Sequence, residues 1–141
     1  MPSRAEIIEA LQFSHIHGQP ALHGSSGARR KLTFAFADEG QPDDLPGPND
    51  FSGWTAFTEA EKETIRAAFA HVETFLNVAF VEVDTISGGP DLNIGKPDLQ
   101  SASVSSVSPW VTGIGGYWLG AGGTWDGYIL FDNSLDLAGE T

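Results

Sequence analysis

The sequence contains no cysteine and only a few basic residues. The missing cysteine excludes disulfides, thiol catalysis and zinc sites with cysteine ligands. Only 7 Lys and Arg stand against 19 Asp and Glu, which gives a formal net charge of −12. A surface this acidic repels phosphate backbones and lacks the basic patch that favours an anionic membrane. We therefore expect neither a nucleic-acid nor a membrane partner.

A long hydrophobic run is also missing. The first fifteen residues, MPSRAEIIEALQFSH, carry no apolar stretch typical of a secretory signal or a membrane span. Residence in the cytosol fits this pattern, and so does export through a C-terminal signal. The chain is nevertheless 40% hydrophobic, with nine Phe and four Trp. Over 141 residues, that supply predicts a single folded domain with a substantial core.

The clearest predicted element is a long helix at about residues 59–76. Thr58 and Glu61 have the spacing of a capping box, in which each side chain bonds the backbone N–H of the other residue. Behind them, one apolar stripe repeats at helical spacing and consists of Ile65, Ala68, Phe69, Val72, Phe75 and Leu76. A short amphipathic helix is expected at residues 4–12, with Ile7, Ile8 and Leu11 on one side.

Alternating apolar and polar residues, with β-branched and aromatic side chains, predict the strands. The expected strands are 31–37, 78–84, 91–95, 115–120 and 126–132. The long helix between the first two strands favours a right-handed crossover, and hence a parallel pair. We predict the α+β class, with a mixed sheet in one domain spanning residues 1–141.

Histidines and carboxylates are the candidate metal ligands. His15, His17 and His23 can in principle hold a transition metal, but we favour a polar loop, since an H-x-H pair alone predicts little. His71 lies off the apolar stripe and is expected to be solvated. The acidic residues Asp38, Glu39, Asp43, Asp44 and Asp50 lack the spacing of an EF-hand loop, so we expect a solvated acidic face. Asp84, Asp91 and Asp98 are expected to cap strands.

Several short blocks, in order, carry a resemblance to a known family. The blocks are KLTFAFAD, FTEAEKETIRAAFAHVETFLNVAFVEVD, PDLNIG and GGYWLGAGGTWDGYILFDNS. Together they resemble the N-terminal half of the protease domain of serralysin-like metallopeptidases, which are secreted bacterial zinc endopeptidases of the metzincin group. The resemblance covers about residues 5–135. Departures from the family pattern include Val72 or Phe75 at the position of a common tryptophan, and Gly120 in place of a proline.

The resemblance implies a fold, an activity and a location. The fold would be zincin-like: a mixed, mostly parallel twisted sheet of about five strands, one long helix and a short N-terminal helix. The activity would be zinc-dependent hydrolysis of peptide bonds, with calcium bound by any repeats that follow the protease domain. A protein of this kind is extracellular and bacterial, and is exported without an N-terminal signal.

The family's zinc motif, H-E-x-x-H-x-x-G-x-x-H, is absent from residues 1–141. In the family it begins shortly after the last strand, so we expect it to follow Thr141 and regard these residues as an N-terminal subdomain. Residues 1–141 alone are therefore expected to hold no catalytic residue and no metal ligand, and to be inactive. The alternatives are a stand-alone, non-catalytic module that binds peptides or proteins, and an interaction domain covered by a partner.

By resemblance, the substrate-binding segment is the edge strand that contains Gly115, Gly116, Tyr117, Trp118 and Leu119. An extended peptide would add there as a further strand. The alternative is a strand that closes the sheet, with Tyr117 and Trp118 packed for stability. The apolar face of strands 91–95 and 126–132 is expected to be partly bare. The missing C-terminal segment, or a second copy of the chain, would cover it.

Overall fold

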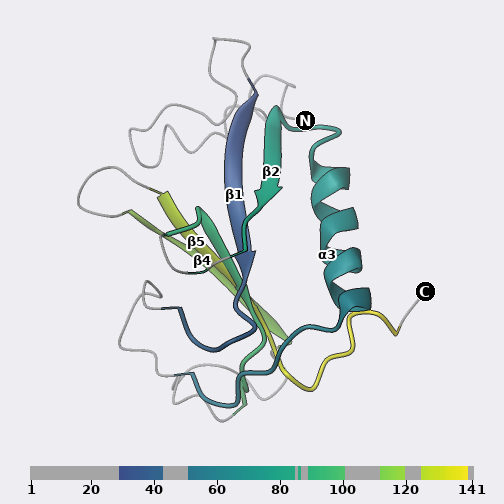
Figure 1. Cartoon of the computed structure of the whole chain (residues 1–141), viewed down its shortest axis with the longest axis vertical. Coiled ribbons are helices and arrows are strands. Elements are labelled where there is room, and N and C mark those ends of the chain that lie inside the picture. The colour runs from purple at the N-terminus through teal and green to yellow at the C-terminus, as the bar shows by residue number, and fades with distance from the viewer. Residues whose placement is uncertain are drawn as a thin grey trace, which may run out of the picture.

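The computed structural model describes residues 29–42, 51–84, 86, 89–100, 112–119 and 125–139 (Figure 1). Within these ranges the chain forms β1 (Arg30–Phe36), α3 (Glu59–Val72), β2 (Val78–Glu82), β3 (Leu92–Gly95), β4 (Gly113–Leu119) and β5 (Trp125–Phe131). This mixed five-stranded sheet with one helix confirms the predicted α+β class. The helix expected at residues 4–12 lies outside the described residues.

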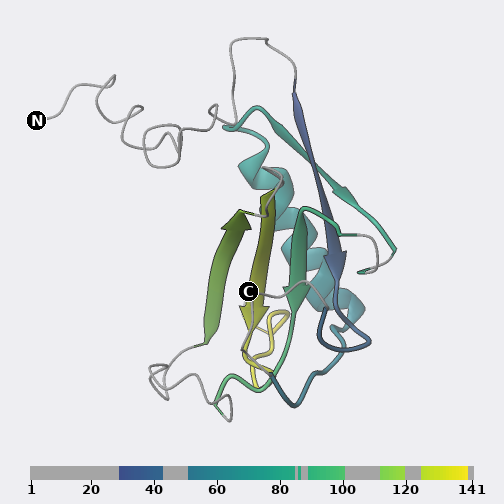
Figure 2. The same cartoon turned by 90° about the vertical axis from the view of Figure 1, so that its left-hand side faces the viewer.

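The strand order in the sheet is β2-β1-β3-β5-β4, so β2 and β4 form its two edges. β1 pairs in parallel with both β2 and β3, and β3 pairs in parallel with β5. Among the described strands, only β4 runs antiparallel, alongside β5, with Gly113 opposite Phe131. Figure 2 shows the sheet from the side opposite to α3, which lies behind the strands. The helix therefore covers one face of the sheet.

Helix α3 begins at the capping box that the sequence predicts. Thr58 Oγ1 accepts the N–H of Glu61 at 3.3 Å, and Glu61 Oε2 accepts the N–H of Thr58 at 2.8 Å. These two bonds satisfy backbone donors that have no partner within the first turn of a helix. The predicted start of the helix is confirmed.

The predicted end of the helix is wrong, because α3 stops at Val72 rather than near residue 76. Thr74 donates from both its backbone N and its Oγ1 to the carbonyl of His71, at 3.0 and 2.7 Å. This turn directs the chain toward the start of β2. The last two residues of the expected apolar stripe, Phe75 and Leu76, therefore lie outside the core. Phe75 is 64% exposed and Leu76 is 42% exposed. Ala68 is exposed as well.

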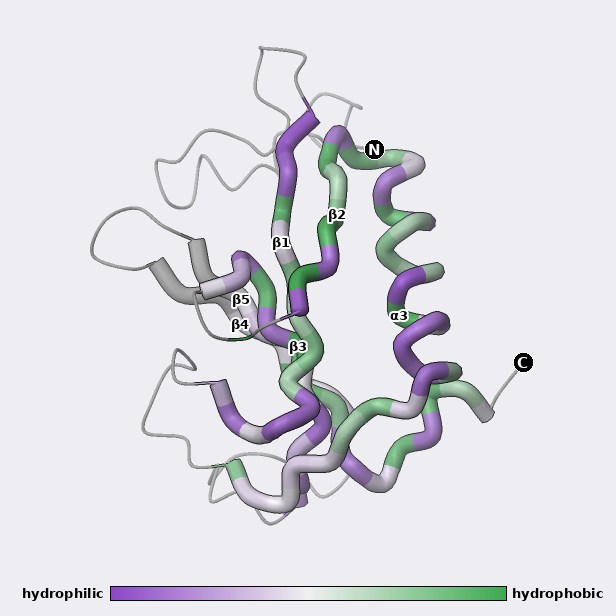
Figure 3. The backbone as a smooth tube through the Cα atoms, viewed as in Figure 1, coloured by the Kyte–Doolittle hydropathy of each residue, from purple (hydrophilic) through white to green (hydrophobic). Residues whose placement is uncertain are grey.

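The main core lies between α3 and the sheet. Phe34, Phe57, Ile65 and Ile94 are buried there, and partly buried aromatic rings surround them. Phe69 of α3 stacks on Phe80 of β2, with ring centroids 4.4 Å apart and an interplanar angle of 13°. Figure 3 shows hydrophobic and hydrophilic residues alternating along α3, as expected for a helix with one buried side.

A second core cluster covers the opposite face of the sheet near the carboxyl end of β3. It contains Phe51, Leu99 and Leu130, with Trp54 packed against them. A Cβ built on Gly95 would lie 2.2 Å from Trp54 Cζ3, so the indole ring occupies the space that a side chain would need. Trp54 Nε1 also donates to the carbonyl of Phe51 at 2.7 Å. The segment at residues 51–54 is thereby held flat against the sheet.

The apolar face of β3 and β5 was expected to be partly bare. Packing against the main core covers part of this face. Leu92, Ile129 and Phe131 are half-buried against the main core, and Ile94 is fully buried. Among the described residues, the exposed large hydrophobics are Phe75 and Leu76, which lie beyond the end of α3.

Candidate functional site

Strand β4 is an edge of the sheet, with β5 as its neighbour. Asp132 N donates to the carbonyl of Thr112 at 2.9 Å, which extends the β4–β5 ladder by one residue pair. Hydrogen-bonded and outward-facing residues alternate along an antiparallel strand, so the even-numbered residues of β4 bond to β5. The N–H and C=O groups of the odd-numbered residues therefore point away from the sheet, at Gly113, Gly115, Tyr117 and Leu119.

Glycines at 113, 115 and 116 leave part of this strand without side chains. A Cβ built on Gly115 would meet no atom closer than the Tyr128 carbonyl oxygen at 3.5 Å, so the space beside it is open. Gly116 differs, because a Cβ there would lie 2.6 Å from Tyr128 Oη. The Tyr128 ring therefore reaches across the strand at Gly116. An added strand can approach the backbone of β4 closely at Gly113 and Gly115.

The structure brings the predicted substrate-binding residues together in this strand. Gly115, Gly116, Tyr117, Trp118 and Leu119 all lie in β4. The sequence pattern missed Gly113, because the strand begins two residues earlier than predicted. The side chains of residues 117–119 lie outside the described part, so the packed-for-stability alternative for Tyr117 and Trp118 remains a prediction.

The segment after β5 fixes the carboxyl end of the sheet. Asp132 is only 2% exposed, and its Oδ2 accepts the N–H of Leu99 at 3.0 Å. Its Oδ1 accepts the backbone N–H and the hydroxyl of Ser134. Asn133 Nδ2 donates to the carbonyl of Gly53 at 2.8 Å. β5, which supports β4, is thus tied to the loop after β3 and to the segment before α3.

A buried ion pair lies at the same end of the sheet. Lys96 Nζ donates to Glu61 Oε1, and these residues are 7% and 2% exposed. Leu137 N donates to the same carboxylate oxygen at 3.4 Å. Burial alone would raise the pKa of Glu61, but the hydrogen bonds from Lys96, Thr58 and Leu137 together lower it to about 2. Glu61 is therefore ionised, and it joins α3 to the segments that follow β3 and β5.

Asp38 and Asp91 are structural carboxylates. Asp38 accepts the N–H of Phe57 at 2.9 Å and pairs with Lys62, so the expectation of a solvated acidic residue is wrong at Asp38. Asp91 Oδ2 accepts both the N–H and the hydroxyl of Thr33, each at 2.7 Å. That arrangement ties the start of β3 to β1 and fits the expected capping role. Asp43, Asp44 and Asp50 lie outside the described residues.

Asp98, Asp84 and Glu39 complete the set of described acidic candidates. Asp98 Oδ1 accepts the N–H of Gln100 at 2.9 Å, which is the bond of an Asx turn after β3. Asp84 and Glu39 are exposed.

In the described ranges, no group of three His, Cys, Asp or Glu side chains could hold a metal ion. His71 is exposed, as predicted, and its ring meets Phe75 edge-on with centroids 5.5 Å apart. His15, His17 and His23 lie outside the described residues. The described side chains therefore do not fit the zinc ion that the family resemblance implies.

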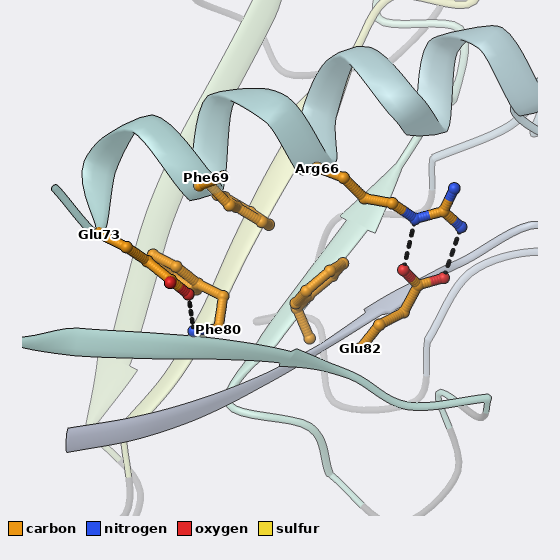
Figure 4. Close-up of a pocket in the computed structure, with 7 residues that line it drawn as sticks. Arg66, Phe69, Glu73, Phe80 and Glu82 are labelled. Atoms are coloured by element: carbon orange, nitrogen blue, oxygen red, sulfur yellow. Dashed lines mark hydrogen bonds and ion pairs between the residues drawn. The ribbon is translucent and has the colours of Figure 1, made fainter. Parts of the chain in front are cut away.

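A hollow of about 230 Å³ lies between α3 and the edge strand β2 (Figure 4). The stacked rings of Phe69 and Phe80 form its apolar wall. Arg66 binds Glu82 through two hydrogen bonds, of 2.6 and 2.9 Å. These bonds lower the pKa of Glu82 and raise that of Arg66. The hollow therefore combines an apolar wall with charged side chains, since Glu73 also lines it.

Sequence reasoning missed the long-range partners in this region. Glu61 was identified only as a cap, and its second partner, Lys96, is 35 positions away in the sequence. Asp132 carried a weak signal, since an Asp-Asn-Ser run is typical of a turn.

The comparisons with known proteins leave the family unassigned. No protein-family model matches the chain, and no curated protein matches it. Within the described residues, α3 is the single helix, and it is too short and too polar to cross a bilayer.

Proposed function

We propose that residues 1–141 form the sheet and substrate-cleft half of a zinc-dependent endopeptidase of the serralysin-like type. The observation that carries this proposal is the open, glycine-containing edge of β4, which runs antiparallel to the rest of the sheet. The chain order of one strand, a long helix and four further strands agrees with the order that the resemblance implies. The proposal includes a zincin-like fold and export from a bacterial cell.

In this proposal the chain binds and orients an extended peptide. Gly113 and Gly115 offer outward N–H and C=O groups, and their lack of side chains allows the peptide backbone to come within hydrogen-bonding distance. β5 supports β4 from behind, and the bonds of Asp132 hold β5 in place. A substrate held along such an edge would lie in a defined register.

Hydrolysis itself is not assigned to these residues. The H-E-x-x-H motif that supplies zinc ligands and a general base does not occur in residues 1–141. Zinc chemistry therefore belongs, in this proposal, to a helix outside this sequence, and the described residues contribute binding and positioning.

The second candidate function is a non-catalytic module that binds peptides or proteins. The same observation favours it, because strand addition along β4 requires backbone groups but no metal. A partner that covers the sheet would use the same surface. Reading the coding DNA after Thr141 separates the two candidates. An in-frame H-E-x-x-H-x-x-G-x-x-H motif supports the endopeptidase, and an immediate stop codon supports the binding module.

Substitutions at Gly115 test the binding edge itself. Gly115→Pro removes the outward N–H and spares the bonds to β5, whereas Gly115→Ala keeps the N–H and fits the open space. With the oxidised insulin B chain as the probe, we expect the proline variant to bind about tenfold more weakly, the loss expected from one hydrogen bond. The alanine variant should bind like the unmodified chain. Equal binding by both variants would show that peptides do not pair with β4.

A further inference from the structure

An exposed apolar patch, formed by Phe75 and Leu76, lies just beyond the C-terminal end of α3. They are 64% and 42% exposed, and they are the exposed large hydrophobic residues of the described ranges. The turn made by Thr74 holds them away from the main core. His71 lies beside them, with its ring edge-on to Phe75. The patch is therefore a small aromatic and aliphatic surface that the described core does not use.

The described chain starts next to this patch. Arg29 Nη2 binds Glu73 Oε2 at 3.1 Å, and Arg30 N donates to the carbonyl of Asn77 at 3.0 Å. Both partners, Glu73 and Asn77, flank Phe75 and Leu76 in the sequence. Figure 1 shows the start of β1 at the same end of the molecule as the turn from α3 to β2. Arg29, the first described residue, therefore lies beside the patch.

The sequence of those residues supplies a matching surface. The helix predicted at residues 4–12 places Ile7, Ile8 and Leu11 on one side. A helix this short gains little stability alone and needs a partner for its apolar side. When extended, residues 13–28 span about 50 Å, so the tether does not limit where residues 4–12 can dock.

Charge favours this segment over a second copy of the chain. A second copy brings another net charge of −12 to the interface. Residues 1–28 carry Arg4 against Glu6 and Glu9, so their charge is nearly balanced. The segment is also covalently attached, which gives it an effective concentration on the order of millimolar.

We propose that residues 4–12 of this chain dock on Phe75 and Leu76 through Ile7, Ile8 and Leu11. The docked segment would cover the patch that Phe75 and Leu76 form after the end of α3. This docking is independent of the function proposed for β4, because the patch and β4 belong to different parts of the fold.

Because the sequence contains no cysteine, two engineered cysteines have no native thiol to compete with them in a disulfide test. In the full chain, Ile8→Cys combined with Phe75→Cys places one thiol on each proposed surface. The matched control combines Glu9→Cys with Phe75→Cys, since residue 9 lies on the opposite side of the predicted helix. Under mild oxidation, we expect an intramolecular disulfide to form at least about tenfold faster in the first variant than in the control. Equal rates, or a disulfide-linked dimer as the main product, would overturn the proposal.

A second measurement avoids engineered thiols. Because Phe75 is exposed, Phe75→Ser should leave the core intact, and the amides of residues 7–11 should exchange with solvent faster than in the unmodified chain. Glu63→Ser, on the exposed side of α3, is the control and should leave their exchange unchanged. If Phe75→Ser has no effect on these amides, residues 4–12 do not dock on this patch.

Discussion

Glu73 accepts the backbone N–H of Phe80, with 2.6 Å between Oε1 and N (Figure 4). Val83 N donates to Phe34 O and Arg30 N donates to Asn77 O, so the odd-numbered residues of β2 face β1. The N–H of Phe80 therefore points away from β1, toward the edge of the sheet. There the Glu73 carboxylate accepts its hydrogen bond. The other edge, β4, presents glycine at outward positions. At Phe80 the β2 edge is therefore capped by a helix side chain, whereas in the described part of the chain no side chain caps the outward groups of β4.

The Glu73→Ala variant tests this closure. Removing the carboxylate should release the Phe80 amide and lower the free energy of unfolding by about 1.5–3 kcal/mol, the range for a hydrogen bond to a charged group. Hydrogen exchange at Phe80 should become fast, while Val81, which faces β1, should stay protected. Glu63→Ala, which removes an exposed carboxylate of the same helix, should leave Phe80 protected. A slowly exchanging Phe80 amide in the Glu73→Ala variant would contradict the assignment.

The Glu61–Lys96 pair makes stability depend on pH. The pKa of Glu61 falls from 4.5 to about 2 on folding. Because the folded pKa is the lower one, the stabilisation is complete above pH 4.5 and is lost as pH falls through about 2. The shift corresponds to about 3 kcal/mol. Glu61→Gln should thus destabilise the chain by about 3–5 kcal/mol at neutral pH, since it leaves Lys96 buried without its partner.

Urea unfolding at neutral pH and near pH 2 measures this effect. The difference between the Glu61→Gln variant and the unmodified chain should shrink markedly at the lower pH. Glu63→Gln is the control, since Glu63 is exposed and pairs with Arg66 at the surface, and it should cost less than about 1 kcal/mol. A pH-independent difference for Glu61→Gln would show that the charge of Glu61 is not the cause.

A substitution at Gly95 tests whether Trp54 packs on the sheet at this position. A Cβ at residue 95 would lie 2.2 Å from Trp54 and 2.9 Å from Leu130 Cδ2, so Gly95→Ala must displace the indole ring. We expect a loss of about 1–3 kcal/mol in the free energy of unfolding, typical of overpacking. Gly115→Ala, which adds the same methyl group in open space, should change it by less than about 0.5 kcal/mol. Equal losses in the free energy of unfolding for the two variants would show that Trp54 does not pack against Gly95.

Zinc binding and peptidase activity can be measured directly on residues 1–141. We expect no stoichiometric zinc after dialysis and no cleavage of an unstructured protein such as casein, because no H-E-x-x-H motif occurs in residues 1–141. Elemental analysis and a gel-based cleavage assay provide the measurements. One equivalent of tightly held zinc, or cleavage that a chelator stops, would show that these residues carry the chemistry themselves.

Local signals in the sequence predicted the elements but not all of their limits. The capping box at Thr58 and Glu61 fixed the start of α3, because both of its bonds lie within one turn. Phe75 and Leu76 continue the helical spacing, so the periodicity extended the predicted helix too far. The turn that ends α3 depends on Thr74 and on the position of β2, which periodicity does not contain.

The spatial arrangement of the strands and the buried charges depends on long-range contacts. β3 lies between β1 and β5, and nothing in the composition of residues 92–95 predicts those neighbours. Lys96 reads as an ordinary surface residue, yet it is buried against Glu61. Asp38 likewise belongs to an acidic run in the sequence but bonds to Phe57 and Lys62. The edge position of residues 115–119, by contrast, was expected from the family resemblance, and Gly113 was not included in that expectation.

The position of β3 has a consequence for synthesis on the ribosome. β1 finds its first neighbour, β2, once residues 78–82 have emerged, and this half of the sheet can form with α3. β3 then adds to β1, but its other side waits for β5 at residues 125–131. During that interval the nascent chain carries an unpaired parallel edge at its centre, and contacts this distant in sequence form slowly. Premature association of nascent chains is therefore expected to begin at β3.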